Sequence, residues 1–302
     1  MRYAMFSTVD DPSPRLGAVH ESGMADVRKI LGQDSPTSSL LALIQAGPEV
    51  WSHVAGRIAE HFSHTPFQSV YPVTGVRWHA PIPRPSKNIV CLGLNYASHV
   101  RETAKLDRPM KLPDLPIFFT KAPTSVTGPN DPIPWDRGAT EQLDYEAELG
   151  VIVGVGGKNI TRSQSLAHVF GYTVVNDVSA RDLQFGHKQF FKGKSLDGFC
   201  PMGPMVVTAD EFGDPQSKHI TLRLNGETRQ DASTGEMIFP VDAILESLSK
   251  GMTIEAGDII ATGTPEGVGL GRTPQEYLKD GDLVETEIEG IGVMRNRVTL
   301  AG

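Results

Sequence analysis

The predicted fold depends on the stretch Asp144-Tyr145-Glu146-Ala147-Glu148-Leu149-Gly150-Val151-Ile152-Val153-Gly154. A second apolar run follows it, at Phe170-Gly171-Tyr172-Thr173-Val174-Val175. Runs of β-branched and apolar residues that end at glycine are typical of strands. Because side chains alternate between the two faces of a strand, Glu146 and Glu148 are expected on one face, about 7 Å apart along it. Asp144 is expected beside them.

Two carboxylates on one face repel each other unless a cation lies between them, and hard divalent ions prefer carboxylate oxygens. A third acid, Asp177, follows the second apolar run. If the two strands are neighbours, Glu146, Glu148 and Asp177 can share one metal ion. A Glu-x-Glu pair on a strand is more often a solvated face. The wholly apolar residues after Glu148 favour the metal site, since they put the acids at the mouth of a buried strand.

The residues after Asp177 read Val178-Ser179-Ala180-Arg181-Asp182-Leu183-Gln184. Arg181 and Gln184 stand at i and i+3 on what is predicted to be the first turn of a helix, so their polar groups share one face. They are therefore candidates for contacts near the acids.

The composition excludes several classes of protein. The 302 residues carry 28 Lys and Arg against 36 Asp and Glu, a net charge of −8, which argues against a nucleic-acid partner. The sequence contains no run of 18 apolar residues, so no membrane span is predicted. No signal peptide is visible at the N-terminus, and a cytoplasmic location is expected. The two cysteines, Cys91 and Cys200, read as buried thiols and not as a disulfide framework.

The chain is predicted to form two domains, at 1–70 and 71–302, with a proline-rich link at their boundary. The first is expected to be a small α+β unit. Its predicted strands and helices are Tyr3–Thr8, Arg15–His20, Ser38–Ile44 and Pro48–His61. Strands dominate the second half of the chain, which favours an α+β protein with an antiparallel or mixed β core over a doubly wound sheet.

A short helix is predicted around Ala97-Ser98-His99-Val100-Arg101-Glu102. His99 and Glu102 lie at i and i+3, where a carboxylate can orient an imidazole as a general base. An ordinary surface ion pair is the commoner meaning of this spacing. A segment rich in charge and proline follows, so residues 95–116 are predicted to form a mobile lid.

Two later segments carry further candidates. Residues 190–204 are predicted to be a loop, in which Lys194 is a candidate oxyanion donor or, alternatively, an exposed lysine. Gly193-Lys194-Ser195 lacks the first glycine of a P-loop, so it is not expected to hold phosphate. Gly263-Thr264-Pro265-Glu266-Gly267-Val268-Gly269 is a tight loop with free backbone amides, and it lacks the spacing of a dinucleotide site.

Together these motifs resemble the fumarylacetoacetate hydrolase family over roughly residues 85–299. The matching stretches are Gly93-Leu94-Asn95-Tyr96 with His99 and Glu102, Lys121-Ala122-Pro123, Asp144 to Leu149, Asn176 to Asp182, Lys194-Ser195 with Cys200 to Pro204, and Gly263 to Gly269. The N-terminal part resembles the variable leader of many bacterial members.

The resemblance implies a β-rich roll of the fumarylacetoacetate hydrolase type, a mixed sandwich-like or barrel-like core, usually in a homodimer. It implies a Mg²⁺ ion, or Mn²⁺ or Ca²⁺, held by Glu146, Glu148 and Asp177. The residues that it implies for catalysis are His99, Glu102 and Lys194. Those that it implies for substrate contacts are Arg181, Gln184, Lys121 and Thr264, with Lys194.

The expected activity is metal-dependent hydrolysis of a C–C bond in a 2,4-dioxo acid such as an acylpyruvate or fumarylpyruvate. C–C cleavage beside a ketone passes through an enolate, which a metal can stabilise as a Lewis acid, while the dyad activates water and Lys194 and Arg181 neutralise charge. Oxaloacetate decarboxylation and isomerisation of a 2-hydroxyhepta-2,4-diene-1,7-dioate-type substrate remain alternatives on the same site. A non-enzymatic binding protein is a further alternative, which the presence of every acid disfavours.

Overall fold

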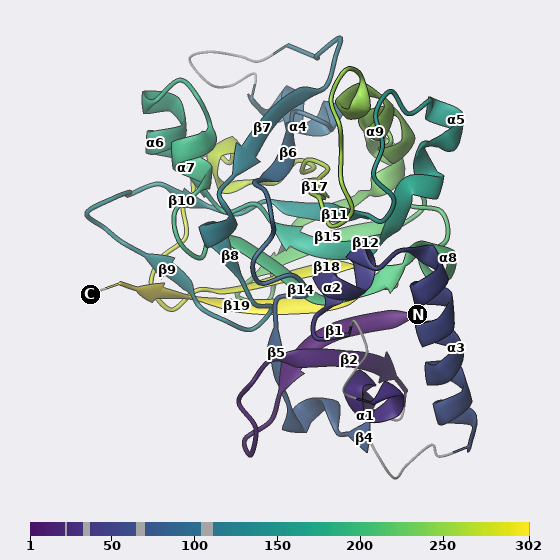
Figure 1. The fold of residues 1–302 in the computed structure, drawn as a ribbon. Helices are drawn as coiled ribbons and strands as arrows, with labels where there is room; N and C mark the ends of the chain where they lie inside the picture. The colour runs from purple at the N-terminus through teal and green to yellow at the C-terminus, as the bar shows by residue number, and fades with distance from the viewer. Residues whose placement is uncertain (22, 33–36, 65–69, 104–110, 302) are drawn as a thin grey trace.

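The computed structural model describes residues 1–21, 23–32, 37–64, 70–103 and 111–301. Strands form the body of the molecule and short helices lie around it (Figure 1). The predicted α+β class with a mixed β core is confirmed. Within the described residues the strand pairings form open sheets and no closed barrel.

The largest sheet runs through the whole molecule. Its strands are, in spatial order, β4 (Val70–Tyr71), β3 (Gly23–Asp26), β2 (Arg15–His20), β1 (Arg2–Ser7), β14 (Cys200–Thr208), β12 (Val169–Asn176), β11 (Ala147–Val153), β17 (Ile259–Ala261), β6 (Ile89–Gly93) and β7 (Ile117–Lys121), with β5 (Arg77–His79) on β1 and β8 (Val126–Thr127) on β14. Most pairs are antiparallel, but β6 pairs with β17 and β8 with β14 in parallel, so the sheet is mixed.

A second sheet packs against the first. Its strands are β16 (Glu227–Ser233), β15 (His219–Leu224), β18 (Leu283–Ile288), β19 (Gly292–Leu300) and β9 (Ile133–Trp135), and a separate pair joins β10 (Leu143–Asp144) to β13 (Ser179–Ala180). The β15–β16 hairpin turns at Asn225 and Gly226, whose φ angles of 53° and 83° suit the tight turn that this dipeptide favours.

The helices are short, apart from α3. They are α1 (Val27–Leu31), α2 (Leu40–Gln45), α3 (Pro48–His64), α4 (Ala97–Glu102), α5 (Arg162–Ser165), α6 (Arg181–Gly186), α7 (Phe191–Lys194), α8 (Ala209–Phe212) and α9 (Val241–Ser249). In Figure 1, α4, α6 and α7 gather at one end of the molecule, and α2 and α3 lie beside the N-terminal strands.

Strand β11 is buried on both faces because two hydrophobic clusters enclose it. Leu149 and Val151 belong to the cluster that fills the space between the two sheets. Ile152 points the other way, into a cluster with side chains of α2 and α3. The alternation expected from the sequence is therefore present, and it leaves Glu148 on the same face as Ile152.

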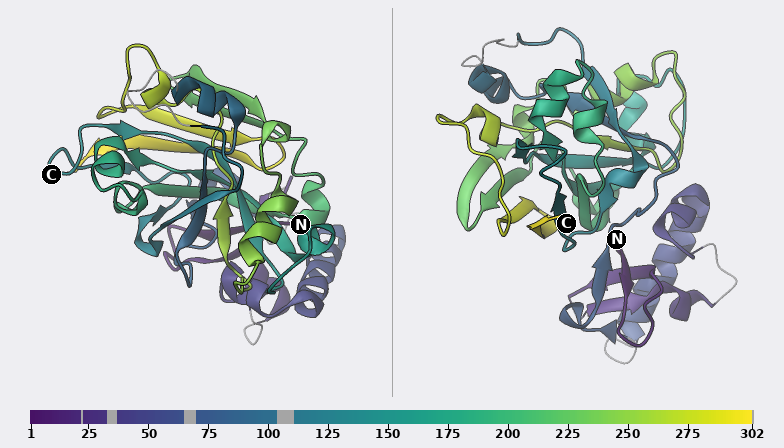
Figure 2. Two further views of the ribbon diagram at one scale, coloured as in Figure 1. Left: turned by 90° about the horizontal axis from the view of Figure 1, so that it is seen from above. Right: turned by 90° about the vertical axis from the view of Figure 1, so that its left-hand side faces the viewer.

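The N-terminal strands continue the main sheet, since β1 pairs with β14 at Tyr3 and Val206. In the right-hand view of Figure 2 the N-terminal part, in purple and blue, extends from one end of the molecule. The boundary near residue 70 stays a prediction.

Two local predictions differ from the structure. Residues 190–204 are not one loop, because α7 begins at Phe191 and β14 begins at Cys200, where it gains ladder partners on β12 and β8. The strand expected from Asp144 is interrupted, so that β10 ends at Asp144 and β11 begins at Ala147.

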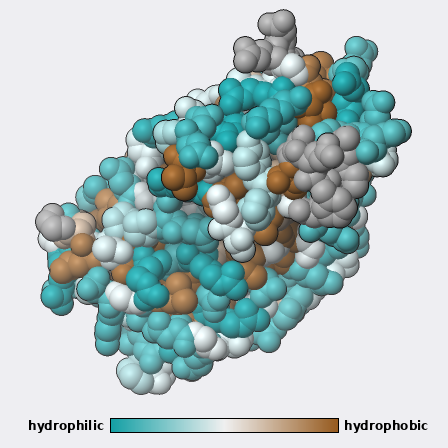
Figure 3. All heavy atoms as spheres, turned by 90° about the horizontal axis from the view of Figure 1, so that it is seen from below, coloured by the Kyte–Doolittle hydropathy of each residue, from teal (hydrophilic) through white to brown (hydrophobic). Residues whose placement is uncertain are grey.

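Hydrophilic residues cover most of the face seen from below, and hydrophobic residues reach it in patches (Figure 3). Exposed apolar side chains include Leu115, and Phe185 and Phe191 of α6 and α7. Assembly as a homodimer stays a prediction.

Among the helices that the structure describes, none has the length and apolar character needed to cross a membrane.

The packing of the second sheet on the first gives a test of the fold. Leu222 on β15 is fully buried in the cluster between the sheets, whereas its neighbour Arg223 is more than a third exposed and pairs with Glu287. Leu222→Ala should cost about 2–5 kcal/mol of unfolding free energy through lost burial and a residual cavity. Arg223→Ala, as the control, should cost less than about 1 kcal/mol. Urea unfolding measures both, and equal small effects would contradict this packing.

Candidate active site

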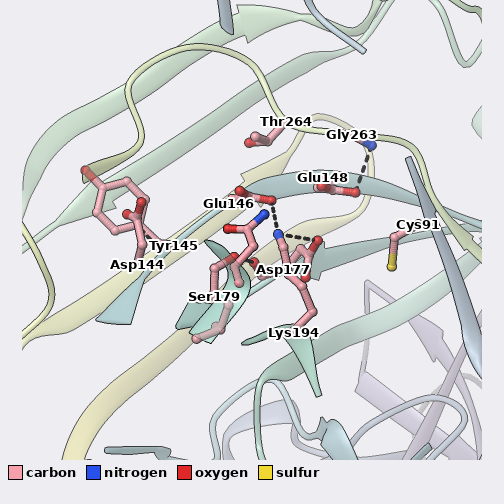
Figure 4. Close-up of polar contacts among 12 residues, drawn as sticks. Cys91, Asp144, Tyr145, Glu146, Glu148, Asp177, Ser179, Lys194, Gly263 and Thr264 are labelled. Atoms are coloured by element: carbon pink, nitrogen blue, oxygen red, sulfur yellow. Dashed lines mark hydrogen bonds and ion pairs between the residues drawn. The ribbon is translucent and has the colours of Figure 1, made fainter. Parts of the chain in front are cut away.

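The three predicted acids meet where β11 begins and β12 ends. These strands pair antiparallel, with Ala147 opposite Asn176, so the residue before β11 lies next to the residue after β12. The amide of Asp177 donates to the carbonyl of Glu146 at 2.8 Å. Carboxylate oxygens of Glu146, Glu148 and Asp177 lie within 4.8 Å of one another, and all three residues are buried. Figure 4 shows them facing one another.

The break between β10 and β11 brings Glu146 into this cluster. At the break, the backbone amides donate hydrogen bonds to side chains and not to the carbonyls of a neighbouring strand. Glu146 N donates to Asn176 Oδ1 at 3.0 Å, and Ala147 N donates to Gln230 Oε1 at 2.9 Å. With its amides satisfied in this way the chain can leave the strand for two residues, Tyr145 and Glu146. Alternation along a continuous strand therefore did not describe Glu146 correctly.

Buried cations surround the acids. Lys194 Nζ lies between two of them, 2.7 Å from Glu146 Oε2 and 2.8 Å from Asp177 Oδ2 (Figure 4). Lys121 Nζ is 2.5 Å from Asp177 Oδ1 and donates to the carbonyl of Val178 at 3.0 Å. The exposed-lysine alternative for Lys194 is thus wrong, because 1% of this residue is exposed.

Arg181 joins the same network from the first turn of α6. Its Nη1 is 2.7 Å from Glu146 Oε1 and donates to Gln184 Oε1 at 3.1 Å, so the predicted i, i+3 pair is formed. Although burial alone disfavours the guanidinium charge, Asp144 and Glu146 raise the pKa of Arg181 above its usual value. Arg181 therefore stays charged.

The environment drives the pKa values of the two glutamates apart. Burial would raise the pKa of Glu146, but Lys194 and Arg181 outweigh it and lower that pKa to about 2. Burial and then the carboxylates of Asp177 and Glu146 raise the pKa of Glu148 well above its usual value. Its Oε2 accepts a hydrogen bond from Gly263 N at 2.8 Å, and no ion pair to Glu148 is formed within the described part of the chain. Glu148 is thus the carboxylate whose charge is least compensated.

This donor set fits a hard divalent ion. It consists of carboxylate oxygens, which Mg²⁺, Mn²⁺ and Ca²⁺ prefer. The ammonium of Lys194 between Glu146 and Asp177 shows that a cation is stable there. Counted as ionised, four carboxylates face three cations: Asp144, Glu146, Glu148 and Asp177 against Lys121, Arg181 and Lys194. The excess negative charge of the centre is the charge that a metal ion would neutralise.

His99 and Glu102 form the predicted dyad on α4. Their side chains meet at 2.5 Å, between Nδ1 of the histidine and Oε1 of the glutamate. His99 is buried and Glu102 nearly so, which removes the ordinary surface ion pair as an explanation. The predicted lid includes residues 104–110, which lie outside the described residues.

A cavity of about 40 Å³ is lined by His99 of the dyad and by Glu146 of the acid cluster. The polar residues that line it are His99, Thr103, Glu146, Arg181, Gln184, Lys194 and Thr264. The structure thus brings together six of the predicted residues, from α4, α6, α7 and the loops around them. Apolar side chains, including Phe119 and Leu270, form the rest of the wall. Lys121 does not line the cavity but lies behind Asp177, so the structure offers no path for its predicted contact with substrate.

Asp144 is a site residue to which the sequence reasoning gave no role. Two nitrogens of the Arg181 guanidinium contact Asp144 Oδ2, Nε at 2.8 Å and Nη2 at 2.7 Å. Its carboxylate also accepts from the amides of Gly269 at 2.7 Å and Leu270 at 3.0 Å. Asp144 therefore ties the arginine to the glycine loop. Its position two residues before Glu146 was the one sequence signal for a role in the site. Its hydrogen-bond partners, however, come from distant parts of the chain.

A buried carboxylate triad that could hold a divalent metal ion thus lies beside a histidine–glutamate dyad in a mixed β core. Residues 88–299 match the family model described as fumarylacetoacetate (FAA) hydrolase C-terminal. The chain belongs to the fumarylacetoacetate hydrolase family, as the resemblance implied.

Two relatives of this chain are both named as oxaloacetate tautomerases. Oxaloacetate tautomerase YisK of Bacillus subtilis is 44% identical over 275 residues, 90% of each chain. A mitochondrial oxaloacetate tautomerase of Bos taurus is 38% identical over 302 residues, 99% of this chain and 91% of its own.

Solved structures of the family agree with the fold. A fumarylacetoacetate hydrolase from Exiguobacterium antarcticum is 42% identical with a TM-score of 0.81, and both chains are covered in full. Maleylpyruvate hydrolase from Sphingobium, solved with manganese(II) and pyruvate, is 28% identical with a TM-score of 0.79 over all of both chains. The family therefore includes a member that holds a divalent metal.

The raised pKa of Glu148 predicts that metal binding releases a proton. Without metal, a carboxyl with a raised pKa binds more protons in the folded state than in the unfolded state, so its contribution to stability falls as pH rises through that pKa. A metal ion needs the carboxylate, so Mn²⁺ affinity should rise as the pH rises toward this raised pKa. Titration calorimetry in buffers of different ionisation enthalpy measures the released proton.

Two variants serve as controls for this prediction. Glu148→Gln should weaken Mn²⁺ binding and remove the proton release, whereas Glu266→Gln, at an exposed residue of the nearby loop, should change neither. Binding that is independent of pH in the wild-type protein would contradict the prediction.

Proposed function

We propose that this protein is a divalent-metal-dependent enzyme that interconverts the keto and enol forms of oxaloacetate or a closely similar 2-oxo dicarboxylic acid. The observation that carries the proposal is the buried His99–Glu102 pair, whose histidine lines one small cavity together with Arg181, Lys194 and Glu146. Tautomerisation needs a positioned base and a cationic environment, and it needs no attacking water. The names of the two tautomerase relatives support the same activity.

The roles of the residues follow from their contacts. Because Glu102 engages Nδ1 of His99, the ring nitrogen for proton transfer is Nε2. In the direction from keto to enol, Nε2 removes a proton from C3 and the C–H electron pair becomes the C2=C3 double bond. The π pair of the 2-oxo group moves onto its oxygen, and the protonated Nε2 delivers the same proton to that oxygen. The reverse reaction returns the proton to C3 by the same path. Glu102 holds the imidazole in orientation and stabilises its charged form.

The cations of the cavity supply the electrostatic part of catalysis. Lys194 and Arg181 neutralise the negative charge that develops on oxygen when C3 loses its proton. Gln184 is held by Arg181, and Thr264 offers a hydroxyl to the substrate. Lys121 orients Asp177 and is assigned no substrate contact. Glu146, Glu148 and Asp177 would hold a divalent metal ion, which would supply Lewis acidity when bound.

Hydrolysis of a 2,4-dioxo acid, the activity that the sequence analysis favoured, is the second candidate. The dyad favours it, since the same base can activate water. The maleylpyruvate hydrolase structure with pyruvate supports it as well. Both reactions stabilise negative charge on an oxygen next to a carboxylate, so the electrostatics of the cavity suit either. Oxaloacetate decarboxylation is a side reaction to be measured with them.

The dyad gives the first test of function. Removal of a general base typically costs ~10²- to 10⁴-fold in rate, so His99→Ala should lose that factor in enol-to-keto conversion of oxaloacetate. The decay of the ultraviolet absorption of the enol, after subtraction of the uncatalysed rate, measures this. Mn²⁺ affinity should persist, because His99 is not a predicted metal ligand.

His53→Ala serves as the matched control, since His53 is an exposed histidine of α3. It should keep the wild-type rate. Full activity in His99→Ala would remove the dyad from the mechanism.

Isotope labelling separates the two candidates. The enzyme is incubated with Mg²⁺ or Mn²⁺ in H₂¹⁸O with acetylpyruvate, with fumarylpyruvate and with oxaloacetate. A tautomerase should convert the oxaloacetate enol fastest and leave each diketo acid uncleaved. Label from water in a released carboxylic acid, formed faster than the enol disappears, would instead establish the hydrolase.

A further inference from the structure

The glycine loop, residues 263–271, donates backbone hydrogen bonds to three carboxylates that come from three different elements. Gly263 N donates to Glu148 of β11 at 2.8 Å. Gly267 N donates to Glu102 of α4 at 2.8 Å. The amides of Gly269 and Leu270 donate to Asp144 of β10 at 2.7 and 3.0 Å. One loop therefore contacts a predicted metal ligand, the acid of the dyad and the acid that holds Arg181.

Glu102 is held from both sides. Its Oε1 lies 2.5 Å from His99 Nδ1, and its Oε2 accepts the hydrogen bond from Gly267. Gly267 itself has no room for a side chain, because its φ is +106° and a Cβ would lie 1.9 Å from the carbonyl oxygen of Arg229 on β16. The donor for Glu102 thus packs directly against the second sheet, while Glu102 belongs to the short helix α4.

Gly271 leaves the space that the Glu102 side chain occupies. A Cβ at this position would lie 2.3 Å from Oε2 and 2.5 Å from Cδ of Glu102. Its backbone lies outside the left-handed region, so alanine is compatible with the local conformation. The closest atoms are the end of a flexible side chain, which can rotate away. Alanine at 271 should therefore displace Glu102 and leave the fold intact.

We propose that the glycine loop is the positioning element of the base: Gly267, by its amide, and Gly271, by its missing side chain, set Glu102 against His99. The inference rests on the dyad as the base of the proposed function. It adds that the orientation of His99 is decided by residues 165 and more positions away in the chain. Gly267 and Gly271 are positioning residues, since they act through Glu102.

The test compares Gly271→Ala with Gly186→Ala, a glycine of α6 whose Cβ would meet open space. Gly271→Ala should lower the rate of oxaloacetate tautomerisation toward that of Glu102→Ala, with Mn²⁺ affinity and the melting temperature close to wild type. Gly186→Ala should match the wild-type protein in all three. In a Glu102→Ala background, Gly271→Ala should cost no further activity, because its target is gone.

A second measurement does not depend on turnover. The proton on His99 Nδ1, short-bonded to Glu102, should give a strongly downfield NMR resonance that is lost in His99→Ala, which assigns it. Gly271→Ala should abolish this resonance and Gly186→Ala should keep it. That result supports the inference even if the wild-type protein turns over no oxaloacetate, which would reject only the proposed function.

Three outcomes would overturn the inference. The first is a Gly271→Ala protein that keeps both the resonance and the wild-type rate. The second is a loss that adds in full to that of Glu102→Ala, which would mean that Gly271 acts on the fold and not through Glu102. The third is a wild-type protein without the downfield resonance, which would remove the short contact itself.

Discussion

Repulsion among buried carboxylates is the constraint on which the rest of this structure depends. Glu146, Glu148 and Asp177 are brought within 4.8 Å of one another away from water, where like charges cost far more than at the surface. The backbone pairing of β11 with β12 imposes this closeness, and the surroundings compensate for it. Lys194 lies next to Glu146 and Asp177. The raised pKa of Glu148 indicates that the negative charge of this third acid is compensated least.

The compensation comes from two kinds of donor with different consequences. Lys121, Lys194 and Arg181 bring full charges, which offset most of the negative charge of the carboxylates. The glycine loop brings backbone amides, which add no net charge and fix the direction in which each carboxylate points. Amides held by the fold also need little reorganisation when charge develops, which is the basis of electrostatic catalysis.

Much of this was readable in the sequence. The apolar runs at 147–153 and 170–175 predict two strands, and the acids at their ends predict a shared site if the strands are neighbours. They are, and antiparallel strands bring the start of one beside the end of the other. The i, i+3 spacings of His99 with Glu102 and of Arg181 with Gln184 predict two side-chain pairs, both of which are formed. Short-range periodicity fixes such contacts, since one turn of helix or one strand repeat sets them.

Contacts between distant segments were decided only by the tertiary structure. The interruption at Glu146 depends on Asn176 and Gln230, whose side chains replace ladder partners at a point that no local pattern marks. Lys121 reads as a substrate contact by resemblance, yet the packing of β7 places it behind Asp177. Lys194 lies in a segment that reads as a loop and is buried as a counter-ion. From the sequence alone, most residues of the candidate site and the short pairs that they form could be predicted. Which charges face one another across the cavity was settled by the packing of whole sheets, because a hydrogen bond such as Gly267 to Glu102 joins segments that share no local period.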